Sequence, residues 1–249
     1  SDSVPEDVYG TLLALSDRLD TLAGLFAINQ PPTGSKDPFA LRRAAIGVLR
    51  LNEHPLLKLD LTEWLQRAFD GQPVESAERA LDQLIQFIKD RERVRLTDSG
   101  YRHDIVVSVQ ASNGLSTAQT EARVKALIQF AEGSDFSALV ATNKRVANLL
   151  KDCEGDSGSV DPSLFSDPSE EGLFSTVTTV SDQVREAVSR ETFSEAISQL
   201  LSMKPATDAF FENVMVNAED TAVRSNRLEL CRMVRDTYRL VADFSSIQQ

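Results

Sequence analysis

Cysteine and histidine are scarce in this chain, and their scarcity excludes several kinds of chemistry. The two cysteines, Cys153 and Cys231, lie far apart without a CxxC motif or a pair of histidines nearby. A zinc site needs about four clustered ligands and a disulfide framework needs more cysteines, so we expect two reduced thiols. The histidines, His54 and His103, leave few general bases, and the sequence has no GxSxG, P-loop or glycine-rich dinucleotide motif. We therefore expect no catalytic residue and no cofactor bound by this chain.

Long apolar runs are also missing from the sequence. No stretch approaches the roughly 18 apolar residues that a membrane-spanning helix needs. The first ten residues are acidic and polar, unlike a signal peptide. We expect a soluble chain that binds neither a membrane nor DNA.

The residues that are abundant favour helices. Leu, Ala, Ser, Arg, Asp and Glu dominate, and aromatic residues make up only 6%. Apolar residues recur at alternating steps of three and four, which is the spacing of one helix face. This pattern covers 5–29, segments beginning at 38 and after 60, and then 76–93, 120–131, 136–151, 170–189, 192–203 and a long last stretch after 224. The sequence therefore predicts an all-α fold, a multi-helix bundle in which helices pack on helices.

Several boundaries carry a chemical signal. Asp37 before Pro38 predicts a helix start, because Asp accepts hydrogen bonds from the first turn and Pro has no N–H to leave unpaired. Asp60 with Glu63 resembles a capping box. Residues 105–109 have strand propensity, but no partner strand is evident nearby, so we favour a helix there. Residues 155–168 are rich in Gly, Ser, Asp and Pro and predict a mobile, solvated connector.

The net charge of −12 at first argues against a nucleic-acid partner. Residues 111–249 hold 13 basic and 21 acidic side chains, a balance of −8. One stretch without a basic residue contains seven of those acids, and the balance is −1 without it: Asp152, Glu154, Asp156, Asp161, Asp167, Glu170 and Glu171. Because the excess acidity is local, the net charge does not exclude RNA binding.

Six blocks of sequence have a distinctive composition. They are LSDRLDTLAG from Leu15, DPFALRRAAIGVLR from Asp37, ATNKRVANLL from Ala141, DAFFENVMV from Asp208, RSNRL from Arg224 and VAD from Val241. In their order and spacing the blocks closely resemble the β subunit of bacterial glycyl-tRNA synthetases. The resemblance implies three parts: residues 1–30 as the last helix of an HD-type domain, 37–110 as a helical connecting domain, and 116–249 as a DALR-type anticodon-binding helical domain at the C-terminus.

The resemblance also implies a function. The family's β subunits are longer than this chain, so we expect the C-terminal portion of one. It would recognise tRNA-Gly, mainly at the anticodon end, while the α subunit uses ATP and glycine in an α2β2 enzyme. The expected location is the bacterial cytoplasm, or the plastid stroma if the source is a plant. The alternative is a non-catalytic helical scaffold that mediates α–β or β–β assembly.

His103-Asp104 is an HD dipeptide, which in HD hydrolases belongs to a metal site. Those enzymes place a final Asp ligand on a later helix, whereas the only similar residue here, Asp17, precedes the dipeptide. A divalent metal needs several converging ligands. We expect no metal site, and we interpret Asp17 as part of a solvated or capped helix face.

Candidate tRNA contacts come from basic and amide side chains on helix faces that point away from the apolar stripes. Lys144 is expected at a phosphate, Asn148 at a base edge, and Arg145 opposite the apolar stripe. The other candidates are the outward row Arg232, Arg235 and Arg239, the cluster Arg91, Arg93 and Arg95 after an apolar helix, and Arg43 and Arg50.

A purely structural role stays open for these candidates. In that role the Arg row is a solvated helix face, and the cluster is placed favourably at a helix C-terminus. Three further polar residues are expected inside. Asn143 is bracketed by apolar positions and predicts a buried amide that ties its helix to a neighbour. Asn226 and Arg227 fall near the apolar side of the last helix and are interpreted as buried ties.

Overall fold

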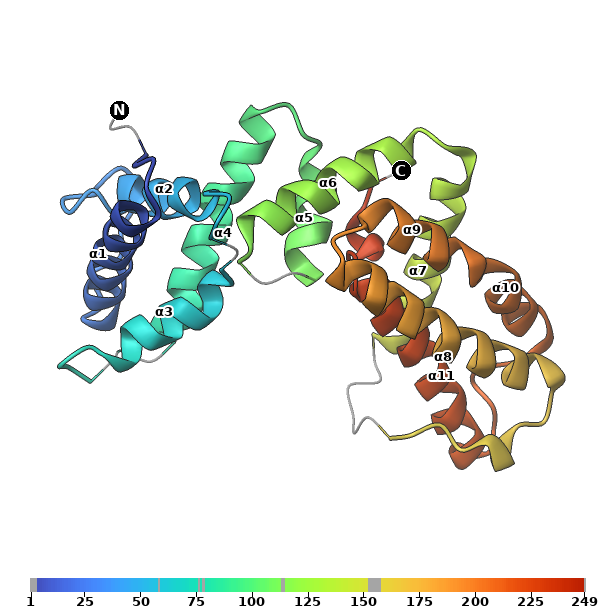
Figure 1. Ribbon diagram of the computed structural model, residues 1–249. Coiled ribbons are helices and arrows are strands. Elements are labelled where there is room, and N and C mark those ends of the chain that lie inside the picture. The colour runs from blue at the N-terminus through green and yellow to red at the C-terminus, as the bar shows by residue number, and fades with distance from the viewer. Residues whose placement is uncertain are drawn as a thin grey trace. The chain divides into compact units, whose positions relative to one another are not determined.

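The fold, seen in a computed structural model, is helical (Figure 1). The structure describes residues 4–57, 59–75, 77, 79–112, 115–151 and 158–248. Over these ranges the only β pairing is an isolated bridge between Thr33 and Lys36. The all-α prediction is confirmed.

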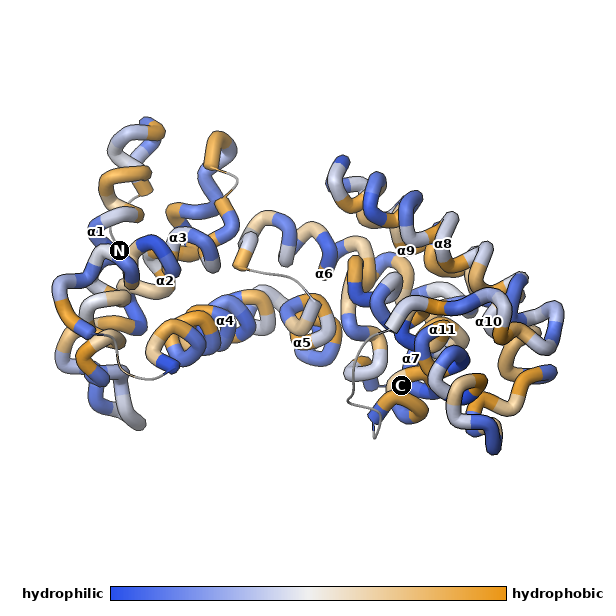
Figure 2. Tube along the Cα trace, turned by 90° about the horizontal axis from the view of Figure 1, so that it is seen from below, coloured by the Kyte–Doolittle hydropathy of each residue, from blue (hydrophilic) through white to orange (hydrophobic). Residues whose placement is uncertain are grey.

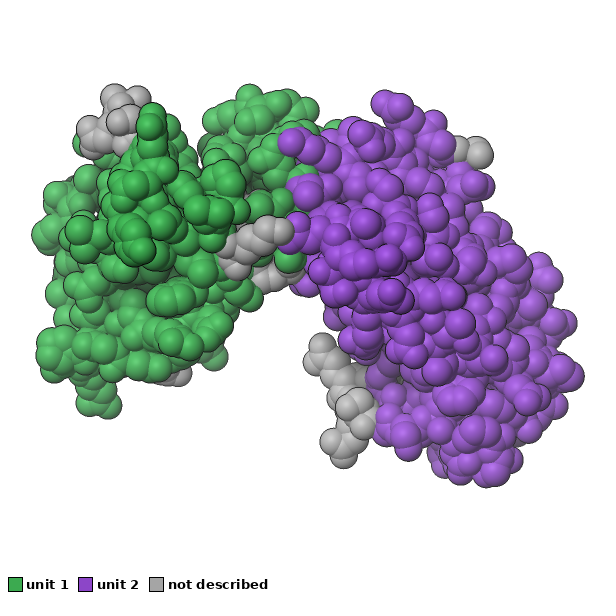
Figure 3. Space-filling model, viewed as in Figure 1, with its two compact units in different colours: residues 1–106, 113–121 green, residues 107–112, 122–249 purple. Residues whose placement is uncertain are grey.

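Contacts divide the chain into two compact units (Figure 3), unit 1 with residues 1–106 and 113–121, and unit 2 with 107–112 and 122–249. Unit 1 holds α1 (Val8–Ala27), α2 (Leu41–Asn52), α3 (Leu61–Asp70) and α4 (Ala80–Asp98). Unit 2 holds α7 (Ser134–Leu150), η1 (Pro162–Leu164), α8 (Pro168–Ser189), α9 (Phe193–Ser202), α10 (Lys204–Asn213), α11 (Thr221–Arg239) and η2 (Phe244–Ser246). The helices α5 (His103–Ser112) and α6 (Thr117–Ala131) contribute to both.

The core of unit 1 is built on the predicted stripe of α1. Leu15, Leu19, Leu22 and Phe26 are all at most 4% exposed, and α1 packs against α2, α3 and α4. The same cluster includes Leu41, Ala45, Val48, Leu49, Leu61, Leu65, Leu84 and Ile88. Burying these apolar faces supplies the main driving force for folding of the unit.

In unit 2, α8 packs against α9, α10 and α11, and α7 packs against α11 and η2. A buried cation that the sequence did not indicate joins α6 to the end of α11. Arg123 donates from Nη1 to the carbonyl oxygens of Leu240 (2.5 Å) and Val241 (3.1 Å), and its guanidinium lies 4.9 Å from the centre of the Phe193 ring. Burial lowers the pKa of Arg123 to about 10, so it stays charged at neutral pH.

Two helix starts differ from the prediction. The helix α2 begins at Leu41 and not at Pro38, because Ala40 takes a left-handed conformation with φ 54°. Asp37 still binds the first turn, accepting hydrogen bonds from the backbone N–H of Leu41 (2.7 Å) and Arg42 (3.0 Å). The helix α4 begins at Ala80 and continues to Asp98, past the predicted end at 93.

Other local predictions had mixed outcomes. Residues 105–109 lie in α5, so the preference for helix over strand is confirmed. Asp60 caps α3 through the N–H of Thr62, while a complete capping box is found at α8, between Asp167 and Glu170. The helix α10 was not predicted; Pro205 in its first turn separates it from α9.

Figure 2 shows hydrophilic and hydrophobic residues on every helix that it labels, as expected of amphipathic helices. None of the helices in the described part of the chain is long and apolar enough to span a membrane. The predicted division at 30, 37, 110 and 116 stays a prediction, and within unit 1 the helix α1 shares its core with α2–α4.

Candidate nucleic-acid interface

A short extended segment between α10 and α11 presents side chains to solvent. Val214 and Val216 are buried, each 6% exposed, whereas Met215 between them is 76% exposed and Asn217 is exposed. The alternation is that of an extended chain, in which successive side chains point to opposite sides. The two valines therefore anchor residues 214–217 while Met215 and Asn217 face outward.

Arg145 of α7 lies beside this segment and stacks on an aromatic ring of α10. Its guanidinium carbon is 4.2 Å from the centre of the Phe211 ring, and Nη2 donates to the Phe211 carbonyl oxygen at 3.4 Å. Arg145 is exposed, and the structure gives it no carboxylate partner among the described residues. The planar guanidinium group of Arg145 and the ring of Phe211 are thus held together at the surface.

These residues line a hollow of about 480 Å³, which we call the α7–α10 groove: Arg145, Leu149, Phe211, Glu212, Asn213 and residues 214–217. Asn148, one helical turn from Arg145, is exposed, and Lys144 is half-buried. The groove combines a stacked cation, a thioether and side-chain amides, with Glu212 as the one acid in its lining. Flat and polarisable groups of this kind stack on nucleobases, and amides hydrogen-bond to base edges.

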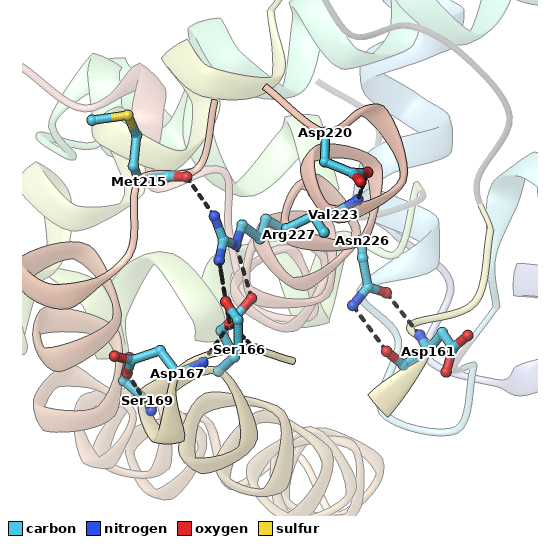
Figure 4. A network of polar contacts seen from close by, with 10 residues as sticks. Asp161, Ser166, Asp167, Ser169, Met215, Asp220, Val223, Asn226 and Arg227 are labelled. Atoms are coloured by element: carbon cyan, nitrogen blue, oxygen red, sulfur yellow. Dashed lines mark hydrogen bonds and ion pairs between the residues drawn. The ribbon is translucent and has the colours of Figure 1, made fainter. Parts of the chain in front are cut away.

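A buried ion pair holds the segment of the groove in place (Figure 4). Arg227 of α11 donates from Nε to Glu170 Oε1 at 2.9 Å and from Nη2 to Ser166 Oγ at 2.7 Å. Its Nη1 donates to the carbonyl oxygen of Met215 at 2.9 Å. One guanidinium therefore links the start of α8, the body of α11 and the outward-facing Met215.

Glu170 is fully buried at the first turn of α8. Burial alone would raise the pKa of its carboxyl group. The hydrogen bonds from Arg227 and from the backbone N–H groups of Ser166 and Asp167 outweigh burial, and the pKa of Glu170 lies below its usual 4.5. The carboxylate is therefore charged at neutral pH and balances the charge of Arg227.

The connector before α8 is tied down as well. Asn226 accepts from the N–H of Asp161 at 2.7 Å and donates to its carbonyl oxygen at 3.0 Å. Glu229 accepts from the N–H of Gly158 at 3.1 Å. Most of residues 158–168 are exposed, as predicted for a solvated connector, but α11 supplies polar partners to the backbone at Gly158 and Asp161. Residues 155–157 lie outside the described residues. Asn226 and Arg227 are both buried and make these polar contacts.

The three arginines of the predicted outward row of α11 each form an ion pair with an acid of the same chain. Arg232 pairs with Glu229, and its side chain is only 14% exposed, so it does not point freely outward as predicted. Arg235 pairs with Asp236 at 2.8 Å, and Arg239 pairs with Asp243 at 3.1 Å. Arg239, at 48% exposure, is the most accessible of the three.

The predicted cluster Arg91, Arg93 and Arg95 lies within α4 and not after it. Arg95 binds Glu53 at 2.7 Å, Arg93 pairs with Asp90 at 3.3 Å, and the guanidinium of Arg91 lies 5.3 Å from the centre of the Phe87 ring. Each cation already has a partner inside unit 1. Arg93 and Arg95 are therefore paired with acids, whereas the partner of Arg91 is an aromatic ring.

Asn143 is 2% exposed, as predicted from its position among apolar residues. The expected tie is not seen, however: its Nδ2 has no hydrogen-bond partner in the parts of the chain that the structure describes.

Asp104 of the HD dipeptide is bound by Arg102 at 2.7 Å, and His103 is exposed. The described residues contain no group of three His, Cys, Asp or Glu side chains that could hold a metal.

Two family models match this chain. Residues 1–111 match glycyl-tRNA synthetase β subunit, and residues 139–243, which include both sides of the α7–α10 groove, match the DALR anticodon-binding domain. Similar proteins named glycine–tRNA ligase β subunit occur in Hahella chejuensis (38% identity over 99% of this chain) and Pseudomonas fluorescens (39% over 98%). The chain belongs to the glycyl-tRNA synthetase β-subunit family. It spans 36% of the length of these relatives.

Of the residues that line the α7–α10 groove, sequence analysis named Arg145 but not Phe211 or Met215, and it did not indicate the buried position of Glu170. Phe211 and Met215 lie in one of the blocks that carry the family resemblance. No helical spacing relates position 145 to position 211, so periodicity alone does not bring them together. Glu170 lies in the acid-rich stretch, and the signal for its burial was the Asp167-Pro168-Ser169-Glu170 pattern of a capping box.

Proposed function

We propose that this chain binds tRNA-Gly, with unit 2 taking the anticodon end through the α7–α10 groove. The observation that carries the proposal is the groove itself, a stacked Arg145–Phe211 pair beside exposed Met215 and amide side chains, inside the segment that matches an anticodon-binding domain. Single-stranded anticodon bases offer the flat faces and hydrogen-bonding edges that such a groove fits.

The chain would serve a glycine–tRNA ligase, the activity in the names of its relatives. We propose that an α subunit carries out the chemistry with ATP and glycine, in an α2β2 enzyme of the bacterial cytoplasm. The β chain would contribute affinity through phosphate contacts and specificity through splayed bases.

A binding titration with two tRNAs tests the proposal. Arg145→Ala is expected to weaken binding of tRNA-Gly by about 1–3 kcal/mol, the usual contribution of one stacked base. It should weaken binding much less when the anticodon bases of the tRNA have been replaced. The matched control is Arg190→Ala, which removes an exposed, ion-paired arginine of the same unit.

Equal losses in the Arg145 and Arg190 variants would contradict the groove assignment. If the unmodified chain shows no salt-dependent binding of tRNA-Gly, it acts as a scaffold and the proposal fails. Because both arginines are exposed, neither change is expected to disturb folding.

A further inference from the structure

A second groove on unit 1 collects three arginines from two helices. Arg43, Gly47 and Arg50 follow one another at steps of four and three, so they share one face of α2. Gly47 has no side chain, and Arg18 of α1 occupies the space above it. A Cβ atom added at Gly47 would lie 2.6 Å from Nε and 3.0 Å from Cδ of Arg18, closer than atoms tolerate. Arg18, Arg43 and Arg50 thus line one hollow.

These arginines are available to bind a ligand. No described carboxylate forms an ion pair with Arg43 or Arg50, in contrast to other arginines of the same unit. Glu53 acts on Arg50 only at longer range, and its carboxylate binds Arg95 at 2.7 Å. Arg18 is held by one hydrogen bond, from Nη1 to a carbonyl oxygen one turn earlier in α1, at 2.9 Å. This bond orients the side chain without neutralising its charge.

The three guanidinium groups line a hollow of about 790 Å³, whose other lining residues include Asp17, Thr21, Phe39 and Ile46. Asp17 is the one acid in the lining, so the groove is positively charged in a chain whose net charge is −12. Phe39 is 50% exposed at the rim. Arg43 and Arg50 are seven residues apart, about 10 Å along the helix axis, which suits an extended polyanion better than a single phosphate group.

We propose that this groove, which we call the α1–α2 groove, binds the phosphodiester backbone of RNA. Guanidinium groups bind phosphate oxygens in bidentate fashion, and an exposed aromatic ring beside them can stack on an unpaired base. The inference rests on the proposed function, that this chain binds tRNA, and adds a phosphate-binding site on unit 1. An acidic protein surface is the competing occupant. The exposed ring and the spread of charge along the helix favour RNA.

The first test uses the salt dependence of tRNA binding. The double variant Arg43→Gln/Arg50→Gln should reduce the slope of log affinity against log salt by about 0.7–0.9 for each phosphate group that the variant no longer binds. The matched control is Arg67→Gln, which removes an exposed arginine of α3 that is paired with Glu63. The control should keep the slope of the unmodified chain. A double variant with the slope of the control would overturn the inference.

The second test uses Gly47→Ala, which should weaken RNA binding without lowering the stability of the fold. Gly47→Ala places a methyl group 2.6 Å from Nε of Arg18, so that side chain must move away from its present position. Alanine is also a better helix former than glycine, so the thermal midpoint should stay the same or rise. The salt slope should fall by the amount expected for one phosphate group. An unchanged slope would count against the groove.

The outcomes separate the two proposals. If Arg145→Ala weakens tRNA binding but the α1–α2 variants match Arg67→Gln, the function stands and this inference fails. If the α1–α2 variants flatten the slope while Arg145→Ala matches its own control, the inference stands and the α7–α10 assignment fails. Normal tRNA binding together with impaired assembly with the α subunit would assign the α1–α2 groove to a protein and overturn the inference.

Discussion

At the scale of single residues, the central feature is a charge pair that the sequence did not indicate. Glu170 belongs to an acid-rich stretch, yet it is fully buried and binds Arg227, whose side chain is only 10% exposed. Removing one member of a buried pair leaves the other charge in a poorly solvated place, which costs far more than losing an exposed pair. Arg227 also binds the carbonyl oxygen of Met215. Loss of the ion pair should therefore affect both the stability of the chain and the position of Met215 in the α7–α10 groove.

The first stability prediction concerns this pair and pH. Glu170→Gln should destabilise the chain by about 3–5 kcal/mol at pH 7. Because the folded-state pKa of Glu170 lies below 4.5, its carboxylate contributes fully above the unfolded pKa, and the contribution is lost as pH falls through the lower folded pKa. The difference in free energy of unfolding between the two proteins should therefore shrink below about pH 4.5. Urea titrations at pH 7, 5 and 3.5 measure it.

The control for this prediction is Glu186→Gln. Glu186 is 69% exposed and pairs with Arg190 at 3.9 Å, so its loss should cost less than about 1 kcal/mol at every pH. Asp161 and Asp167 titrate in the same acidic range, with pKa values lowered by hydrogen bonds from Ser163 and Ser169. Comparing variants at one pH removes their contribution. A Glu170→Gln difference that stays constant from pH 7 to 3.5 would mean that the ion pair is not its source.

At the scale of elements, the segment before α8 is part of the scaffold. Asn226 exchanges two hydrogen bonds with the backbone of Asp161, in the manner of a neighbouring β-strand, while Arg227 binds Ser166. The helix α11 thus organises residues 158–168 on one side and the 214–217 segment on the other.

The corresponding prediction is that Asn226→Ala strands the Asp161 N–H and carbonyl groups and costs about 1–3 kcal/mol of unfolding free energy. Asn148→Ala, at an exposed position of α7, should change stability by less than about 0.5 kcal/mol. Chemical denaturation of both variants checks this. If Asn226→Ala is as stable as Asn148→Ala, the hydrogen bonds from Asn226 do not hold this segment in place.

At the scale of the whole molecule, the net charge of −12 does not describe how charge is distributed locally. Most of the arginines proposed from sequence are paired with acids of the same chain, including Arg95, Arg232, Arg235 and Arg239. The arginines that line the two grooves, Arg145 in one and Arg18, Arg43 and Arg50 in the other, form no ion pair with a described carboxylate. An acidic protein can bind RNA in this way because local unpaired charge decides the contact.

Each unit carries its own core, which leads to a prediction about local stability. Leu65→Ala in unit 1 and Leu200→Ala in unit 2 each remove a fully buried leucine and should cost about 2–5 kcal/mol. Hydrogen exchange should show faster exchange in α1–α4 for Leu65→Ala and in α8 and α9 for Leu200→Ala. The two variants serve as controls for each other. Faster exchange across both units in either variant would show that the chain unfolds as one cooperative block.

The sequence by itself determined the helices and most of their buried faces, because helical periodicity is a local property that needs no knowledge of the partner. The stripe of α1 and the inward position of Asn143 were predicted in this way, whereas helix was favoured at 105–109 because no partner strand was evident. The family resemblance likewise followed from blocks that can be read along the chain.

Only the tertiary structure decided which polar groups meet. Arg95 with Glu53, Glu170 with Arg227, Arg145 with Phe211 and Arg18 over Gly47 join elements distant in sequence. A helix face shows that an arginine points outward, but not whether another helix brings a carboxylate to it. That choice depends on how the helices pack, which is set by the shapes of the buried apolar faces and is not written in the spacing of the charges.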